Sequence, residues 1–384
     1  MKVAVLGYGT VGAGVYSMLS DAPGMEAGPV LVRPGKAVES FMVSDAALIF
    51  GDPTVDAVVE TLGGLDPAYS YGMRALEAGK HFITANKAMV AAHGLELAAL
   101  AREKGAAFLF SAACGGGVPF LHNLALSAET DRIEAVSGIL NGTTNYMLDA
   151  MQRRGLSYGD ALREAQSLGY AESDPTADVS GLDALRKMQL ACAVAFGVLP
   201  QSGMLCEGME HFTAADVEDI QSRGLVCRLM ARGSRAGESV SAYVEPVLFP
   251  RAAPESSVFT NNNMARYTGK RCGSIVLMGQ GAGRFPTASA VLRDLAAAQQ
   301  GARSMFPENC RAADADNREA VHSYYIRTGG FAAVRLSLRS VLAQGEVVRA
   351  VTKPMSAEKM HALAQNIRKD GNDLFFAALE EELC

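Results

Sequence analysis

The chain lacks the features that mark several specialised classes of protein. Its seven cysteines are scattered and include no CxxC pair, so nothing in their spacing indicates a metal or redox centre. An odd number of dispersed cysteines predicts free thiols in a reducing environment, which favours a cytoplasmic protein.

There is also no block of like charge and no long apolar run. The formal net charge is −6, with basic and acidic residues interspersed, so we expect neither a nucleic-acid partner nor a membrane surface. The longest obvious apolar run, Leu190 to Leu199, is about half of the roughly 20 residues that cross a bilayer. Glycines at 7, 9 and 12 interrupt the apolar start, which favours a first β-strand over a signal peptide.

What remains is the composition of an ordinary globular protein. The 384 residues are 49% hydrophobic and 20% charged, which suits two or three domains with a substantial core. Together with the absences above, this composition favours work on a small molecule.

The N-terminal segment carries a dinucleotide-binding pattern. A short apolar run, Lys2 to Leu6, precedes Gly7-Tyr8-Gly9-Thr10-Val11-Gly12, and an apolar helix pattern follows through about Leu19. In G-x-G-x-x-G the first two glycines allow a tight turn close to a pyrophosphate, and the third lets the helix pack on the strand. The helix N-terminus then faces the phosphates. The alternative is a plain glycine turn.

The second predicted strand, Pro29 to Val32, is followed by Arg33. An acid at this place would accept the ribose 2′-hydroxyl of NAD, whereas an arginine attracts the 2′-phosphate of NADP. Arg33 therefore favours NADP, with NAD possible; the alternative is a solvated loop charge.

Further strands are predicted at 56–60, 81–84 and 108–110, with helices near 69–78 and 89–104 between them. This alternation indicates an α/β fold with a Rossmann-type doubly wound parallel sheet. Ligands bind beyond the carboxyl ends of such strands, where Leu62-Gly63-Gly64 and Thr84-Ala85-Asn86-Lys87 fall.

A second group of polar residues lies in the middle of the chain. A small-residue turn at 138–146 is followed by a carboxylate-rich segment at 169–187. Asp183 and Lys187 are four residues apart in a helix pattern from about Val179 to Phe196, so they share a face and can pair. If the loop with Glu172 and Asp178 folds against that face, four charged groups converge. Such a site suits a small charged metabolite; an ordinary helix salt bridge is the alternative.

These motifs, in this order from Val3 to about Leu295, resemble those of the homoserine dehydrogenases, which interconvert L-aspartate 4-semialdehyde and L-homoserine with NAD(P). The resemblance implies that Lys187 is the general acid/base and that Lys87 assists beside the coenzyme. Asp183 would orient Lys187, while Glu172 and Asp178 would hold the substrate ammonium group. The resemblance further implies that Tyr170, Gly142 and Thr143 complete the substrate pocket.

Two glycine-rich turns add to the resemblance. Gly115-Gly116-Gly117-Val118-Pro119 resembles a turn whose carbonyls hold a monovalent cation such as sodium, with Cys114, Gly116 and Val118 as ligands. Ser111 stands where the family has glutamate. The later turn at 279–283 resembles the family's return to the nucleotide domain, with Gly281 beneath the coenzyme. The predicted coenzyme contacts are Gly7, Gly9, Thr10, Val11, Gly12, Arg33, Leu62, Gly63, Lys87 and Gly281.

The resemblance also implies a domain plan. Residues 1–120, completed by 280–305, would bind the coenzyme, and 121–279 would form an α+β catalytic and dimerisation domain, so we expect a homodimer or homotetramer. Residues 320–384 resemble a short, degenerate ACT-like regulatory domain.

Two other functions fit parts of the sequence. Aspartate semialdehyde dehydrogenase shares the Rossmann plan but needs a cysteine nucleophile, for which no cysteine here has an activating context. A non-catalytic NADP-binding regulatory protein would explain Ser111 and the altered C-terminal segment, but both lysines and all three carboxylates remain.

Overall fold

The structure, a computed structural model, describes residues 1–380, so Cys384 and the end of the predicted C-terminal domain lie outside the described residues. The chain forms two compact units. Unit 1 comprises residues 1–133, 189–199 and 269–311; unit 2 comprises 134–188, 200–268 and the C-terminal part from 312. The chain passes between units within β7 (Ile133–Ile139), α9 (Leu182–Phe196), β8 (Val198–Pro200), β12 (Asn262–Gly269) and β14 (Arg311–Ala313).

Unit 1 is built on a parallel sheet with the strand order β3-β2-β1-β4-β5-β6. This is the strand order of the dinucleotide-binding fold. In that fold the order in which strands are added reverses between β1 and β4, which opens a crevice at the carboxyl ends of these strands. The predicted doubly wound parallel sheet is thereby confirmed. Its strands are β1 (Lys2–Leu6), β2 (Glu26–Leu31), β3 (Met42–Val43), β4 (Ala57–Glu60), β5 (His81–Thr84) and β6 (Phe108–Leu109).

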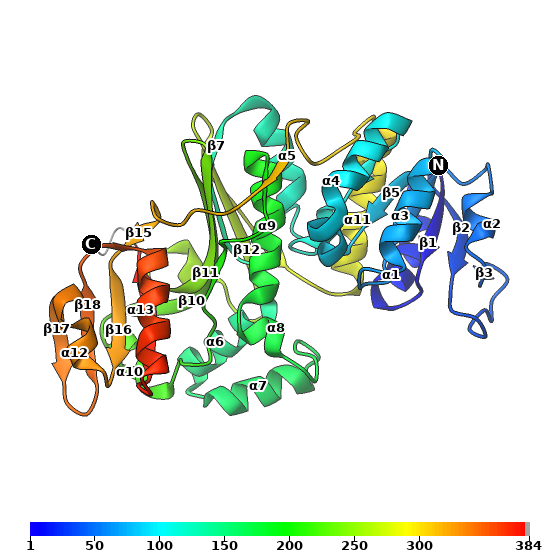
Figure 1. The fold of residues 1–384 in the computed structure, drawn as a ribbon. Coiled ribbons are helices and arrows are strands. Elements are labelled where there is room, and N and C mark those ends of the chain that lie inside the picture. Colours follow the sequence, from blue (N-terminus) through cyan, green and yellow to red (C-terminus); the bar gives the residue numbers. More distant parts are fainter. Residues whose placement is uncertain (381–384) are drawn as a thin grey trace. The chain divides into compact units, whose positions relative to one another are not determined.

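Helices accompany this sheet, with α1 packed beside α11 and α3 beside α4 (Figure 1). Every residue of β1 and β4 except Lys2 is buried, as expected for a sheet that is covered on both faces. The helical elements of unit 1 are α1 (Thr10–Leu19), α2 (Ala47–Phe50), α3 (Ala68–Glu77), α4 (Lys87–Lys104), the 3₁₀ turn η1 (Ser111–Ala113), α5 (Phe120–Thr130) and α11 (Arg284–Gln299), the last preceded by strand β13 (Gly273–Gln280).

Unit 2 contains a mixed sheet whose strands run in the order β12-β7-β10-β11-β20-β16-β18-β17, with β9 also paired to β11. Its central pair, β10 and β11, is a long antiparallel hairpin in register from Leu225 opposite Pro250 to Ala236 opposite Ser239. The first part of the unit contributes β7 (Ile133–Ile139), α6 (Gly142–Arg154), α7 (Tyr158–Ser167), α8 (Thr176–Val179), β9 (Leu205–Cys206), α10 (Ala214–Ser222), β10 (Leu225–Ala236), β11 (Ser239–Pro250), η2 (Pro254–Ser257) and β12 (Asn262–Gly269).

The C-terminal segment continues this sheet. The order of its last four strands, β20-β16-β18-β17, and the connections β16-α12-β17-β18-α13-β20 are those of a split βαβ unit. Val247 on β11 and Phe376 on β20 lie in one buried apolar cluster with Met360 of α13. The elements are β15 (Val321–His322), β16 (Tyr324–Thr328), α12 (Phe331–Val334), η3 (Arg335–Ser337), β17 (Leu338–Gln344), β18 (Val348–Thr352), β19 (Met355–Ser356), α13 (Ala357–Lys369) and β20 (Leu374–Leu379).

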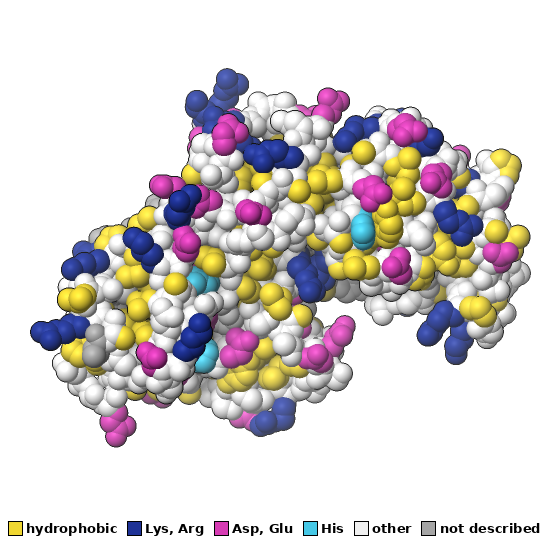
Figure 2. All heavy atoms as spheres, viewed as in Figure 1, with side chains coloured by type: hydrophobic (Ala, Val, Ile, Leu, Met, Phe, Trp, Pro, Cys, Tyr) yellow, Lys and Arg dark blue, Asp and Glu magenta, His cyan; other side chains and the backbone are white. Residues whose placement is uncertain are grey.

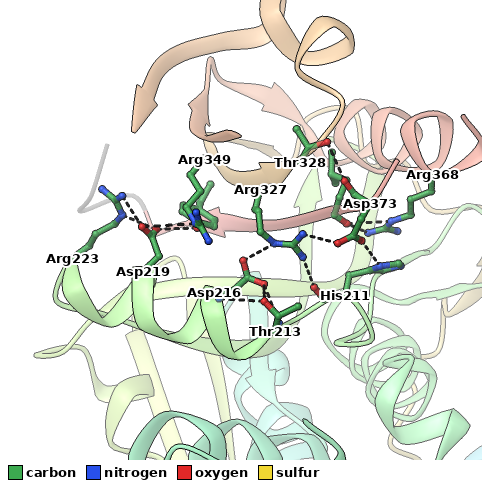
Figure 3. Close-up of polar contacts among 12 residues, drawn as sticks. His211, Thr213, Asp216, Asp219, Arg223, Arg327, Thr328, Arg349, Arg368 and Asp373 are labelled. Atoms are coloured by element: carbon green, nitrogen blue, oxygen red, sulfur yellow. Dashed lines mark hydrogen bonds and ion pairs between the residues drawn. The ribbon is translucent and has the colours of Figure 1, made fainter. Parts of the chain in front are cut away.

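A buried ion pair fastens the C-terminal segment to α10 (Figure 3). Arg327 on β16 donates to Asp216, whose side chain is fully buried and caps α10 together with Thr213. The same guanidinium reaches Asp373, which also accepts from His211 at 3.0 Å if that ring nitrogen carries the proton. Because breaking a buried pair leaves an unpartnered charge, the Arg327–Asp216 contact holds the two parts together specifically.

The predicted elements of unit 1 are present, with bounds that agree within three residues. The helix predicted from about Val179 to Phe196 is α9, which begins three residues later, at Leu182. Val179 ends α8, Gly181 adopts a left-handed φ of +83°, and α9 begins at Leu182. A glycine in that conformation ends one helix and allows the next to start in a new direction.

The surface bears mixed charges. On the face drawn in Figure 2, basic and acidic side chains are interspersed with apolar and neutral ones. Within the described residues, no helix has the length and apolar character that a membrane span needs.

Candidate active site

A cavity of about 1010 Å³ opens at the carboxyl end of the parallel sheet in unit 1. Gly7 and Gly9 line it, together with Arg33 just beyond β2 and the Leu62-Gly63 turn after β4. Five of the ten predicted coenzyme contacts are therefore brought together at one cavity. Arg33 is exposed there, and Lys36 adds a second positive charge to the lining.

The third glycine of the motif has a packing role. Thr10, Val11 and Gly12 form the first turn of α1 and are not among the residues that line the cavity. A Cβ on Gly12 would lie 2.1 Å from the carbonyl oxygen of Gly7, so only glycine lets α1 approach the end of β1 this closely. The N-terminus of α1 is thereby directed at the turn that lines the cavity.

The two loops that follow β4 and β5 are tied by a buried network. Glu60 accepts from the backbone amides of Leu62 at 2.6 Å and Gly63 at 3.2 Å, and from the hydroxyl of Thr84. The Thr84 hydroxyl in turn accepts from the amide of Asn86 at 2.9 Å. The network therefore fixes both loops against each other.

Lys87 is the first residue of α4, directly after this network, and is half-buried. Its predecessor Asn86 caps the helix by accepting from the amide of Met89, while its amide group donates to Gly64 at 2.6 Å. A cation at a helix N-terminus is opposed by the helix dipole, so folding alone does not favour a lysine here. This position is consistent with selection for function.

In unit 2, Lys187 and Asp183 form an ion pair one turn apart on α9. Lys187 Nζ lies 2.7 Å from Asp183 Oδ2, and the two side chains are only 12% and 14% exposed. Nζ also donates to the carbonyl oxygen of Leu140 at 2.6 Å, from the turn before α6. The predicted i, i+4 pair is therefore formed, and a second segment holds the ammonium group in place.

Asn141 joins this pair to Asp178. Its amide nitrogen donates to Asp178 at 2.7 Å and to Asp183 at 2.9 Å, while its oxygen accepts from the amide of Thr144 and caps α6. Burial raises the pKa of Asp178; the Asn141 hydrogen bond lowers it, and the neighbouring Asp183 raises it. Asn141 thus keeps two carboxylates at one place.

Of the remaining predicted substrate residues, three lie at or beside the start of α6, and the fourth, Glu172, lies on an exposed loop. Thr143, in the first turn of α6, donates to the carbonyl oxygen of Tyr170 at 2.6 Å, and the Tyr170 ring lies 5.1 Å from that of Tyr146. Gly142 opens α6 so close to Asn261 that a Cβ would lie 2.8 Å from its carbonyl oxygen. Glu172 is exposed, and within residues 1–380 its side chain makes no ion pair or hydrogen bond.

Asn141 was not singled out by the sequence, nor was the carbonyl group of Leu140. The available signal was an asparagine directly before a Gly-Thr-Thr helix start, which is a typical N-cap. The second role of its amide depends on contacts with residues 37 and 42 positions away, which no local pattern reveals.

The turn at Cys114 to Val118 lies in unit 1 against the segment before α11. The amide of Gly117 donates to the carbonyl oxygen of Gln280 at 3.0 Å, and a Cβ on Gly116 would lie 2.4 Å from that of Gly281. The structure therefore brings the predicted cation turn and the predicted coenzyme residue Gly281 together.

Three buried cysteines do not fit a nucleophile. Cys114, Cys192 and Cys227 are buried, and burial raises the pKa of the Cys192 thiol well above its usual value and that of Cys227 to about 12. Since the thiolate is the nucleophile, these cysteines are unsuited to forming an acyl-enzyme.

Comparisons with known proteins agree with these features. Residues 7–111 match the family model described as "Homoserine dehydrogenase, NAD binding domain", and residues 119–296 match "Homoserine dehydrogenase". Similar curated relatives are the homoserine dehydrogenases of Corynebacterium glutamicum and Synechocystis sp.. The first is 38% identical over 317 residues, covering 77% of this chain and 71% of the relative; the second is 37% identical over 319 residues, covering 77% and 72%.

Among solved structures, a homoserine dehydrogenase from Thiobacillus denitrificans is 30% identical, with a TM-score of 0.87 over 99% of this chain and 98% of that one. The similarity thus extends through the C-terminal segment. Neither a non-catalytic function nor aspartate semialdehyde dehydrogenase is supported by any of these comparisons. The chain belongs to the homoserine dehydrogenase family.

Proposed function

We propose that this protein catalyses the reversible reduction of L-aspartate 4-semialdehyde to L-homoserine with NADP as its preferred coenzyme, and that Lys187 is its general acid and base. The observation that carries the residue assignment is the buried contact of Lys187 Nζ with both Asp183 and the Leu140 carbonyl. A fixed ammonium group of this kind can deliver a proton to one defined place.

The proton and hydride balance is simple. When bound, the nicotinamide coenzyme supplies the hydride to the aldehyde carbon or takes it back from the alcohol. In reduction, the carbonyl oxygen gains negative charge, and Lys187 Nζ gives it a proton to form the hydroxyl group. In oxidation, the neutral amine accepts the hydroxyl proton. Asp183 and the Leu140 carbonyl keep Nζ oriented in both directions.

The substrate also carries an ammonium and a carboxylate group. Asp178, held by Asn141, offers a carboxylate for the ammonium group, and we propose Glu172 as a second, from a loop that is exposed in the described conformation. Thr143, Gly142 and Tyr170 would border the remainder of the pocket. We further propose that Lys87 lies beside the coenzyme and assists charge stabilisation at the reacting oxygen.

The coenzyme preference rests on the cavity of unit 1. Arg33 and Lys36 both line it, and a pair of cations suits the 2′-phosphate of NADP better than the 2′-hydroxyl of NAD. The glycines at 7 and 9 leave backbone room for the pyrophosphate, and Thr10, Val11 and Gly12 would present helix amides to it. Leu62, Gly63 and Gly281 complete the proposed contacts.

Family membership supports four further proposals. The protein would act as a homodimer or homotetramer in the cytoplasm; residues 1–120 with 280–305 would be the coenzyme domain and 121–279 the catalytic domain. The segment from 320 onward would be an altered ACT-like domain.

The direct test is oxidation of homoserine by the purified full-length chain with NADP or NAD, followed at the nicotinamide absorbance. Turnover with both coenzymes and a higher kcat/KM with NADP is the expected result. Absence of turnover with either coenzyme, in a protein that still binds NADPH, would disprove the catalytic proposal.

A further inference from the structure

The turn at Gly115 to Val118, which by resemblance should hold a monovalent cation, has a protein cation beside it. Arg293 on α11 donates from Nη2 to the carbonyl oxygen of Gly117 at 3.0 Å. Gly117 lies between Gly116 and Val118, two of the three predicted ligands. The guanidinium is half-buried, so its charge is only partly screened by solvent.

Other carbonyl groups of the turn already accept hydrogen bonds. The oxygen of Val118 accepts from the amide of Phe120 at 2.7 Å, and that of Gly115 accepts from the amide of Val118 at 2.9 Å. A cation site made only of carbonyls needs several of them directed at one point. Here two carbonyl oxygens of the turn already accept hydrogen bonds from amides of the same segment.

The carboxylate near the turn is also engaged. Ser111 stands where the family has glutamate, and both its amide and its hydroxyl donate to Asp294, the neighbour of Arg293 on α11. Asp294 is 1% exposed, and burial raises its pKa to about 7, against the lowering effect of the Ser111 hydrogen bonds. Such a carboxyl group is not a permanent negative charge that could balance two cations.

The charge of Arg293 also acts on a nearby imidazole group. Burial lowers the pKa of His122 on α5, and the charge of Arg293 lowers it further. The region therefore favours neutral neighbours around one fixed cation, and a metal ion added beside the guanidinium would be repelled by it. The residues present do not fit a bound sodium or potassium ion.

We propose that the Arg293 guanidinium takes the place of a monovalent cation at the Gly115–Val118 turn, so that this protein folds and functions without sodium or potassium at that position. The charge is permanent because arginine does not lose its proton in proteins. Its position on α11 also connects the turn to the helix that follows Gly281.

This connection gives the proposal a second readout. Gly117 is bonded both to Arg293 and, through its amide, to Gln280, which precedes Gly281. Loss of the guanidinium should therefore loosen the segment that we propose to lie beneath the coenzyme. NADPH affinity reports on that segment, and neither it nor the melting temperature requires turnover, so the proposal can be tested even if the proposed activity is wrong.

The experiment measures thermal unfolding, NADPH binding and homoserine oxidation of the full-length protein in NaCl, KCl or N-methyl-D-glucamine chloride at equal ionic strength. The native protein should behave alike in all three salts, within about twofold in NADPH affinity and rate. Arg293→Met should gain a requirement, binding NADPH about tenfold more tightly in NaCl or KCl than in the organic salt, a difference of about 1.4 kcal/mol.

Arg303→Met is the matched control. Arg303 also donates to backbone carbonyls in unit 1, those of Ala298 and Ala302, at 3.3 and 3.1 Å, but beyond the opposite end of α11. It should lose a similar charge without gaining any response to the metal cations. Arg293→Lys keeps the charge and should stay independent of them.

Two results would overturn the proposal: a native protein that needs sodium or potassium, or an Arg293→Met protein that folds and responds to no cation. Refolding of that variant only in NaCl or KCl would support it. If the variant folds in no salt, the native protein and Arg293→Lys decide, because cation dependence in either contradicts the proposal.

Discussion

The candidate residues of unit 1 and those of unit 2 differ in how their charged groups are held. In unit 1 the cavity is lined by glycines at 7 and 9, and the charged groups at its edge, such as Arg33, are exposed. In unit 2 Lys187, Asp183 and Asp178 are largely buried and already paired with protein groups. The proposed coenzyme binding thus depends on open backbone, whereas the proposed chemistry depends on side chains held before the substrate arrives.

This difference has an energetic reason. A site made of exposed amides and a flexible arginine costs the protein little when no anion is bound. A buried ammonium group without partners would be strongly unfavourable, so Lys187 needs Asp183 and the Leu140 carbonyl even in the free protein. Substitutions should therefore affect turnover most in unit 2 and binding most in unit 1.

The largest effect is expected from Lys187→Ala. Without the group that moves the proton, kcat for homoserine oxidation should fall by roughly two to four orders of magnitude, while NADPH affinity stays within about twofold. Stopped-flow or steady-state kinetics and a fluorescence titration measure the two quantities. Arg186→Ala is the matched control, since Arg186 is exposed on the same helix. A turnover near that of the native protein would remove Lys187 from proton transfer.

Gly12→Val tests the packing of α1. The new Cβ would meet the Gly7 carbonyl at 2.1 Å, so we expect about 1–3 kcal/mol of destabilisation and a coenzyme affinity lowered by about tenfold. Gly9→Ala serves for comparison, because its Cβ would meet nothing within 4 Å and its φ of −79° suits alanine. Equal melting temperatures for both variants would contradict the close approach of helix and strand.

Arg33→Ala should change selectivity more than activity. If its guanidinium contacts the 2′-phosphate, kcat/KM with NADP should fall by about tenfold and that with NAD should hardly change. NAD is the internal control, because the variant protein is the same in both assays. A parallel fall with both coenzymes would mean that Arg33 supports the loop and does not read the phosphate.

The smallest effect is expected for Asn141→Ser, which keeps a helix cap but loses the amide donor to two carboxylates. The Asn141 hydrogen bond lowers the pKa of Asp178 against burial, so its loss raises that pKa. A smaller fraction of Asp178 is then ionised at a given pH, and the acidic limb of the kcat/KM profile for homoserine should move to higher pH. An unchanged or acid-shifted limb would show that Asp178 does not hold the ammonium group.

The same contrast explains which parts of the site could be predicted from the sequence. Gly7, Gly9 and Gly12 form a local motif between a strand and a helix, and Asp183 with Lys187 is a local pair on one helix, so short-range rules identify both. The Leu140 carbonyl is 47 residues from Lys187, and only the folded chain brings them together. The start of α9 at Leu182 could not be placed from the sequence, because a sequence does not show that Gly181 adopts a left-handed conformation.

The parallel pairing of β11 with β20, through Val247 opposite Ala378, makes the C-terminal segment a poor candidate for deletion. Shortening the chain before β16 would strip β11 of a neighbour, leaving backbone amides and carbonyls available to another molecule. Such a truncated protein would tend to aggregate, and its lost activity would say nothing about regulation. Point substitutions on the outer strand β17 would be the gentler way to learn whether the segment senses a metabolite.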